Sequence, residues 1–196
     1  MYDMQKMQTF LKKRLSRERF THTMNVAKEC ERLAGLYGAD PEKACFAGLV
    51  HDICKEDPKQ QQYDWAVRSN MGLCPEEAAS YKVWHGIAGA YFLRTEFGIA
   101  DADILNAVRY HTVGRSGMSL LEKIVYLGDM ISQERDYSGV EVMRRTCHED
   151  SLELGMLYAL RYTLRKQLKR NALIPHFTLE AYNEYTRMFP ENTYHI

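Results

Sequence analysis

The sequence lacks any apolar run of the roughly 18 residues that a membrane-spanning helix needs. Its N-terminal stretch, MYDMQKMQTFLKKRL, is polar and amphipathic and has no apolar core of the kind a signal peptide carries. These two absences argue against a membrane protein and against a secreted precursor. They lead us to expect a cytoplasmic protein with no membrane partner.

An excess of charge of one sign is also missing, since 26 Lys and Arg residues balance 26 Asp and Glu residues. Proteins that bind nucleic acid in general need basic surface to displace counterions from the phosphates. The balance therefore argues against nucleic acid as a partner. It leaves room for a small basic pocket.

Paired cysteines are absent. The count is odd, and no Cys-x-x-Cys pair occurs among Cys30, Cys45, Cys54, Cys74 and Cys147. We expect reduced, partly buried thiols in a reducing compartment, because a disulfide framework uses an even number of cysteines. A thiolate metal site is not favoured without paired spacing.

The alternation typical of strands is almost absent, whereas apolar residues recur with helical periodicity along most of the 196 residues. The sequence predicts an all-α protein, a helical bundle in which residues 1–196 form one domain. A helix is expected over 17–37, ended by Gly38. The pair Asp40-Pro41 is typical of the start of the next helix.

Other boundaries follow from the same local signals. Residues 59–82 predict one or two short helices with a break near 70–72, and a further helix is expected over 85–97. Asp101 is expected to cap a helix that runs to about residue 111. Ser119 and Glu122 form a capping-box pattern. Asp150 and Thr178 are expected to cap the last two helices.

Histidines are spaced so that one falls in, or at the end of, each of four expected helices. His51 is followed by Asp52, directly after the apolar stretch 48–50. Buried polar groups need partners, and a metal ion is the natural partner for a histidine beside a carboxylate. We therefore predict a metal site at His51 and Asp52, with His22 and Asp129 as candidate partners from two other helices.

The remaining histidines are open to a plainer interpretation. A lone histidine on a helix is more often a core or surface residue than a ligand. From the residues alone, this is how we interpret His148, His176 and His195. His85 and His111 are kept as candidates because they share the spacing of the first two.

Several cationic or hydroxyl side chains near these positions are candidates for phosphate binding. Lys55 follows the His-Asp pair by about one helical turn, and Thr112 and Arg115 lie in a glycine-containing loop. Arg135 follows Asp129 by six residues. Each has an alternative interpretation as a solvated lysine, a surface loop or an ordinary salt bridge. The basic run over 161–170 is interpreted as a solvated helix face.

An ordered set of motifs resembles a known family. The motifs are Arg19-Phe20-x-His22, Leu49-Val50-His51-Asp52-x-x-Lys55, His85-Gly86, Tyr110-His111-Thr112-x-Gly114-Arg115, Met118-Ser119-x-Leu121-x-Lys123, Tyr126-Leu127-Gly128-Asp129, Arg135-Asp136-Tyr137 and Ala181-Tyr182-Asn183. Over nearly the whole chain they resemble the YqeK-type members of the HD superfamily of metal-dependent phosphohydrolases. One departure is Gly128, where the family usually has alanine, and Ile53-Cys54 is a less common choice.

The resemblance implies an HD-domain helical bundle that hydrolyses a dinucleoside polyphosphate, diadenosine tetraphosphate, symmetrically to two ADP. It implies iron, as one or two ions, while histidine and carboxylate ligands also suit manganese or cobalt. By position, it makes His22, His51, Asp52 and Asp129 the main metal ligands, and His85 and His111 ligands of a second metal or phosphate contacts. Asp52 and Lys55 become the catalytic residues. Substrate would contact His22, His85, His111, Thr112, Arg115, Asp129 and Arg135, with the nucleoside pocket lined by Ala172, Leu173, Ile174, Pro175, His176 and Phe177.

Other functions stay open at this point. Another HD activity is possible in principle, such as a nucleotidase or an alarmone hydrolase. A non-catalytic module that senses nucleotides is a second alternative. The sequence does not fix the number of ions, the metal or the oligomeric state, for which a homodimer is one candidate.

Overall fold

The computed structural model describes residues 3–191, which form helices and, within that range, no strands. The first half contains α1 (Met4–Arg14), α2 (Arg17–Tyr37), α3 (Pro41–Val50), α4 (Lys59–Arg68), α5 (Pro75–Ala78) and α6 (Tyr81–Glu96). The second half contains α7 (Ala102–Tyr110), α8 (Leu120–Ile131), α9 (Val140–Arg145), the π-helix η1 (Thr146–Asp150), α10 (Leu152–Lys169) and α11 (His176–Met188). The predicted all-α class is confirmed.

Several helix ends lie where the local signals predicted them. Helix α2 ends before Gly38, which adopts a left-handed conformation with φ of 73°. The carboxylate of Asp40 accepts a hydrogen bond from the amide of Lys43 at the start of α3. Ser119 and Glu122 form both hydrogen bonds of the capping box at the start of α8. Short-range side-chain chemistry therefore accounts for these boundaries.

The segment between α3 and α7 resolves into α4, α5 and α6, and α6 begins at Tyr81, before the expected start at His85. The short α5 is held by a buried ion pair. Arg109 of α7 donates from both terminal nitrogens to the two carboxylate oxygens of Glu77, at 2.7 Å each. The indole of Trp84 donates to the carbonyl of the same glutamate at 2.8 Å. These bonds fix α5 against α6 and α7.

Two of the expected caps are wrong. Asp150 is the last residue of η1, and Ser151, whose hydroxyl accepts from the amide of Leu154, caps α10 instead. Helix α11 begins at His176, so Thr178 lies inside it. The buried hydroxyl of Thr178 donates to the carbonyl of Val113 at 2.7 Å, which ties α11 to the loop after α7. Both side chains serve contacts that a local pattern does not reveal.

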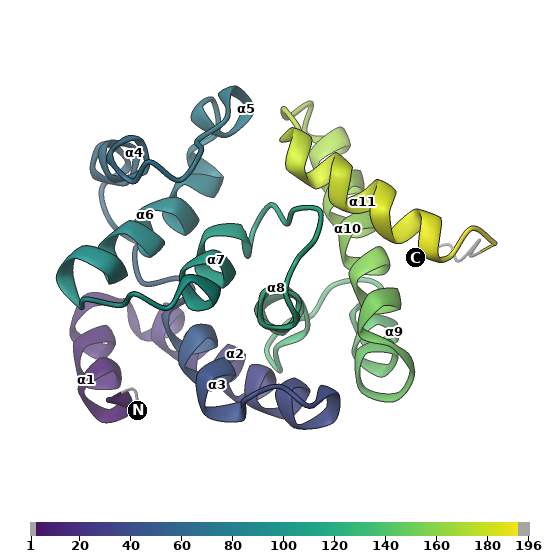
Figure 1. Ribbon diagram of the computed structural model, residues 1–196, viewed down its shortest axis with the longest axis horizontal. Coiled ribbons are helices and arrows are strands. Elements are labelled where there is room, and N and C mark those ends of the chain that lie inside the picture. The colour runs from purple at the N-terminus through teal and green to yellow at the C-terminus, as the bar shows by residue number, and fades with distance from the viewer. Residues whose placement is uncertain (1–2, 192–196) are drawn as a thin grey trace.

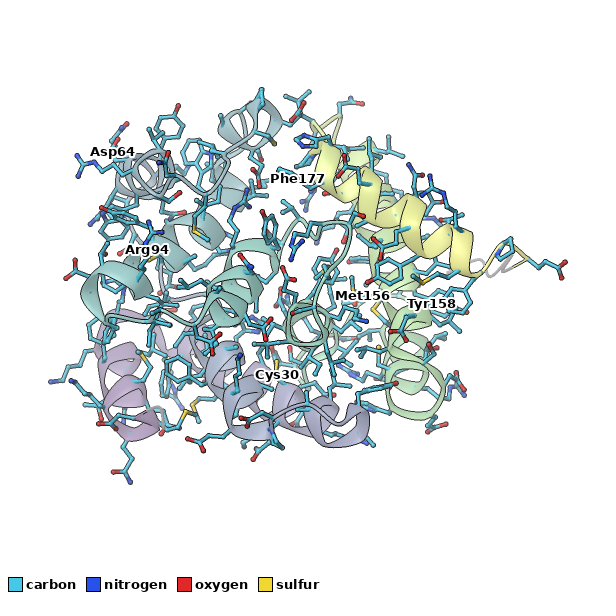
Figure 2. All side chains as sticks on the ribbon, viewed as in Figure 1. Cys30, Asp64, Arg94, Met156, Tyr158 and Phe177 are labelled. Atoms are coloured by element: carbon cyan, nitrogen blue, oxygen red, sulfur yellow. The ribbon has the colours of Figure 1, made fainter. Side chains whose placement is uncertain are left out.

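Helix α8 lies near the middle of the molecule, with α2 and α3 on one side, α7 on another and α10 on a third (Figure 1). Helix α2 crosses α3 and α8 at short distance, and Cys30 of α2 lies at both crossings (Figure 2). A Cβ added at Gly48 of α3 or Gly128 of α8 would lie 2.8 or 2.6 Å from the Cys30 sulfur. Only glycine permits this approach without movement of the neighbours.

The hydrophobic core contains buried side chains from α1, α2, α3, α6, α7, α8, α9, η1, α10 and α11. Helix α10 packs against α8, and α11 packs against α10 (Figure 1). No helix within residues 3–191 combines the length and apolar character that crossing a bilayer requires. His195 lies outside the described residues, and the one-domain boundary of 1–196 stays a prediction.

Candidate metal and phosphate site

Three closely packed helices bring together the residues that the sequence predicted as metal ligands. His22 projects from α2, His51 is the C-cap of α3, and Asp129 lies on α8. His51 follows Gly48 by three residues and Asp129 follows Gly128 directly. The helix crossings at Cys30 therefore lie next to two of the three ligands and set the distance between them.

Backbone carbonyls orient two of the imidazole rings. The Nδ1–H of His51 donates to the carbonyl of Gly48 at 2.7 Å, and the Nδ1–H of His111 donates to the carbonyl of Val108 at 2.7 Å. Each bond fixes the tautomer, so that the other ring nitrogen, Nε2, is left unprotonated and turned inward. Imidazoles held in this way are ready to coordinate a metal through Nε2.

The first group of inward-facing atoms surrounds Asp129 and one oxygen of Asp52. The Nε2 of His22 lies 3.1 Å from Asp129 Oδ1 and 3.8 Å from Asp52 Oδ2. The Nε2 of His51 lies 3.9 Å from Asp129 Oδ1 and 3.4 Å from Asp52 Oδ2. Ligand atoms from His22, His51 and Asp129 all lie within 4.8 Å of one another, as one ion requires.

The second group surrounds the other oxygen of Asp52. Its Oδ1 lies 3.2 Å from His85 Nε2 and 3.5 Å from His111 Nε2, and these two nitrogens are 3.2 Å apart. The Lys55 Nζ lies 3.1 Å from His85 Nε2. Ligand atoms of His51, Asp52 and His111 form a second set within 4.8 Å. The carboxylate of Asp52 thus faces both groups and is in position to bridge them.

The donor set fits a metal ion. The Nε2 atoms of His22 and His51 and the Oδ1 of Asp52 are buried and have no hydrogen-bond partner. Leaving three buried polar atoms unsatisfied is costly unless something binds them. Imidazole nitrogen and carboxylate oxygen are ligands that first-row divalent metals prefer. A divalent cation would satisfy the two imidazole nitrogens, and a second cation or a phosphate-bound group would satisfy Asp52 Oδ1 on its other side.

The electrostatics favour charged carboxylates beside a neutral His85. Burial opposes ionisation of Asp52, but the nearby His51 and Lys55 hold the pKa of its carboxyl well below the usual range. Burial likewise acts against Asp129, whose pKa is held low by His22 and other neighbours. Burial and the Lys55 charge lower the pKa of His85 to about 3. Asp52, Asp129 and His85 are therefore in the protonation states that a metal needs.

A second ring of polar residues supports the ligands. Glu134 accepts from His22 Nδ1, and Arg19 donates to Asp52 Oδ2 at 2.9 Å. The guanidinium of Arg135 binds the Asp129 carboxylate, and its Nε donates to the Asp129 carbonyl at 2.8 Å. Arg135, a predicted phosphate contact, is thus at the site.

Sequence reasoning assigned no role to Arg19 or Glu134. Arg19 lies three residues before His22 and therefore on the same face of α2, a signal that was available. No local pattern connects Glu134 with His22, which lies 112 residues away. Partners so distant in sequence meet only once the fold has formed.

Lys55 reaches the site by a different local geometry from the one expected. Residues 51–57 form successive i→i+3 turns, with Lys55 N bonded to the Asp52 carbonyl at 2.9 Å, and do not continue α3. With about three residues per turn, Lys55 shares a side with Asp52 and not with His51. The turn therefore sets the lysine beside the carboxylate.

A cleft of about 430 Å³, here called the first cleft, opens on the second group of ligands. It is lined by Lys55, His85, His111, Thr112 and Asp129, and further by Lys82, Tyr162, Lys166 and Arg170. Two members of the basic run over 161–170, Lys166 and Arg170, are exposed as expected and also line this cleft. Lys166 and Arg170 add positive charge to a cleft that already holds Lys55.

The predicted nucleoside segment lies beside the first cleft, but only part of it faces that way. Leu173, Ile174 and Pro175 line a small hollow together with Thr112. Ala172 precedes them, and its amide donates to the carbonyl of Gln167. The other two residues turn toward α5 and α7, with His176 Nδ1 3.7 Å from Glu76 Oε2 and the Phe177 ring 6.0 Å from that of Tyr110.

Arg115 is not brought to the cluster. Its Nε and Nη2 donate to the two oxygens of buried Glu122 at 2.8 and 2.7 Å. It lines neither the first cleft nor the cleft that contains His22. A contact between Arg115 and phosphate requires this ion pair to open.

The fold and the His-Asp cluster define a class of protein. The chain belongs to the HD domain family, which it matches over residues 19–134. The resemblance drawn from the motifs is thereby confirmed at the level of the superfamily.

Individual relatives agree on a narrower group. The chain is 35% identical over 175 residues to the symmetrical bis(5'-nucleosyl)-tetraphosphatase of Bacillus subtilis, covering 88% of this chain and 92% of that protein. It is 38% identical over 174 residues to the protein of the same name from Halalkalibacterium halodurans, covering 89% and 92%. A crystal structure from Clostridium acetobutylicum, of a predicted HD superfamily hydrolase involved in NAD metabolism, superposes with a TM-score of 0.90. That match has 34% identity and covers 96% of this chain and 99% of the other.

Proposed function

We propose that this protein is a metal-dependent phosphohydrolase that cleaves diadenosine tetraphosphate symmetrically to two ADP. The observation that carries the proposal is the set of buried polar atoms without hydrogen-bond partners on His22, His51 and Asp52, in a His-Asp cluster beside a basic cleft. The names of similar relatives supply the substrate class, a bis(5'-nucleosyl) tetraphosphate. Hydrolysis forms a bond from the water oxygen to one central phosphorus and breaks its bond to the bridging oxygen. Each product then carries two phosphates.

The proposed ligands of the main ion are His22, His51, Asp52 and Asp129. His85 and His111 either bind a second ion, bridged by Asp52, or contact phosphate directly. When bound, a divalent ion supplies Lewis acidity that polarises a phosphoryl oxygen and acidifies water. Iron is the proposed metal, with manganese or cobalt as substitutes, because the donors are imidazole nitrogens and carboxylate oxygens.

The protein's own residues would bind and orient the polyphosphate. The Lys55 Nζ lies 3.1 Å from His85 Nε2, beside the second ligand group and on the wall of the first cleft. Thr112 has a buried hydroxyl without a hydrogen-bond partner, which is available to a phosphate oxygen. Arg135, already bonded to Asp129, lines the neighbouring cleft that contains His22. Together these groups stabilise the negative charge that develops on the phosphate under attack.

The direct test is product analysis. The protein, purified without chelator and supplied with iron or manganese, is incubated with diadenosine tetraphosphate, and the products are separated by anion-exchange chromatography. ADP as the sole product, with loss of reaction on adding chelator, supports the proposal. AMP with ATP would overturn the cleavage position. Bound metal and ADP without turnover would favour a sensing module instead.

Variants connect the activity to the cluster. His51→Ala and Asp52→Ala are expected to lose turnover and metal content together, because each removes a ligand. His148→Ala is a matched control, since His148 bonds Glu29 at 2.5 Å and belongs to neither ligand set. A variant that lost its metal but kept its rate would overturn the metal-dependent mechanism.

A further inference from the structure

A second cleft of about 860 Å³ opens on the first group of ligands. His22, Glu134 and Arg135 form its inner wall, and Arg17, Arg19, Tyr137, Tyr162 and Lys166 are among its other lining residues. We propose that this second cleft binds one nucleoside diphosphate half of the substrate while the first cleft binds the other. The inference rests on the proposed function and adds a binding site to it.

The two clefts adjoin along α10, and metal-ligand candidates line each of them. Tyr162 and Lys166 of α10 line both. His85 and His111 face the first cleft, whereas His22 faces the second. A substrate with two equal halves that is cut at its centre needs room for one half on each side of the reacting phosphorus. Each cleft has a volume in the roughly 300–1,000 Å³ range that small-molecule sites occupy.

The chemistry of the second cleft suits a nucleotide. Neither Arg17 nor Lys166 makes an ion pair with another residue in the described part of the chain, so both cations are available to phosphate. Arg19 and Arg135 are already bonded to the aspartates. Three carboxylates also line the cleft, and Glu134 among them is taken by His22. The other two offer acceptors for ribose hydroxyls.

Aromatic surface is available for a base. The rings of Tyr137 and Tyr162 stack with centroids 4.4 Å apart and an interplanar angle of 29°. The hydroxyl of Tyr137 donates to the carbonyl of Met130 at 2.8 Å, which fixes the pair against α8. Aromatic rings can stack with a base, and neighbouring cations can bind its phosphates. Such a combination binds nucleotides with little preference for the identity of the base.

The test is a binding measurement that needs no turnover. The metal-loaded protein is titrated calorimetrically with a diadenosine tetraphosphate analogue whose central bridging oxygen is replaced by methylene. Arg17→Glu is expected to weaken binding of the analogue by about tenfold or more, since it replaces a charged donor with a repulsive group. Arg32→Glu is the matched control. It makes the same charge change on an exposed position of α2, about 22 Å along the helix, and lines neither cleft.

The wild-type protein is also expected to bind the analogue at least about tenfold more tightly than ADP, because the analogue fills both clefts. Equal affinity for the two ligands would overturn the inference. An Arg17→Glu variant that binds the analogue like Arg32→Glu would overturn it as well. Tyr137→Leu is an independent test, because it removes the stacking surface and should also weaken binding of the analogue. Failure of the proposed function is distinguishable, since it appears as absent cleavage while binding in both clefts persists.

Discussion

Replacing Gly128 with alanine tests how the helix crossings position the metal ligands. The new Cβ would lie 2.6 Å from the sulfur of Cys30, which is fully buried, and 3.6 Å from the Cys30 amide nitrogen. Since the sulfur also lies 2.8 Å from the Cβ position of Gly48, it has little space into which to move. Either α2 and α8 separate or the sulfur is forced against α3. Asp129 is the next residue along α8 and would be displaced with it.

The expected magnitude follows from two opposing effects. Overpacking a well-filled core costs about 1–3 kcal/mol. Alanine is more favourable than glycine inside a helix by about 0.5–1 kcal/mol. Gly128→Ala should therefore lower the free energy of unfolding by about 0.5–2 kcal/mol. In the background of Cys30→Ala the clash disappears, and the same substitution should become neutral or stabilising.

The assay is urea denaturation of the four proteins of this double-mutant cycle, in the presence of chelator so that metal does not contribute. A coupling free energy of about 1–3 kcal/mol in favour of the double variant is expected. Gly35→Ala is the control, because Gly35 lies in α2 and a Cβ there meets nothing within 4 Å. That variant should be slightly stabilised. Additive effects at residues 30 and 128, with no coupling, would refute the reasoning.

Three further predictions concern buried charges. Glu77→Ala leaves Arg109 unpaired at 0% exposure, and should lower the free energy of unfolding by about 3–5 kcal/mol in urea titrations. Glu134→Gln removes the charge beside His22 Nδ1, and should weaken metal binding about 10–100-fold in metal titrations while the fold persists. In metal-free protein, burial lowers the pKa of His22 but bonds to Asp129 and Glu134 outweigh it and raise the pKa to about 9. Because the pKa of His22 is higher in the folded than in the unfolded protein, protonation of His22 stabilises the fold fully at pH values below about 6.5. The free energy of unfolding should therefore fall as the pH rises from about 6.5 through 9. A flat profile over that range would contradict this assignment.

The helix ends were predictable because they depend on a few neighbouring residues. Gly38, Asp40 and Ser119 act within one turn of the positions they cap, and the structure has each cap where the sequence predicted it. The His51-Asp52 pair was predictable for a related reason. Two polar residues directly after an apolar helix must be buried with partners, whatever the remainder of the fold looks like.

Other features could not be derived from local patterns. Asp150 and Thr178 have the chemistry of caps, yet one is drawn into a π-helical turn and the other bonds a loop 65 residues away. Arg115 is a plausible phosphate ligand by sequence, but in the structure its guanidinium forms an ion pair with buried Glu122. In each case a tertiary contact competes with the local preference and prevails.

The position of Asp52 connects the chemistry to the symmetry of the cleavage. Its Oδ2 faces His22 and His51, on the side of the second cleft, and its Oδ1 faces His85 and His111, on the side of the first. The carboxylate of Asp52 therefore lies between two groups of histidines, and His22 from one group lines the second cleft while His85 and His111 from the other line the first. If the two clefts bind the two halves of the substrate as proposed, the midpoint of the substrate, and not an end, would lie at these ligands. Cleavage into equal halves would then follow from where the helices cross, with no separate device that measures the chain of phosphates.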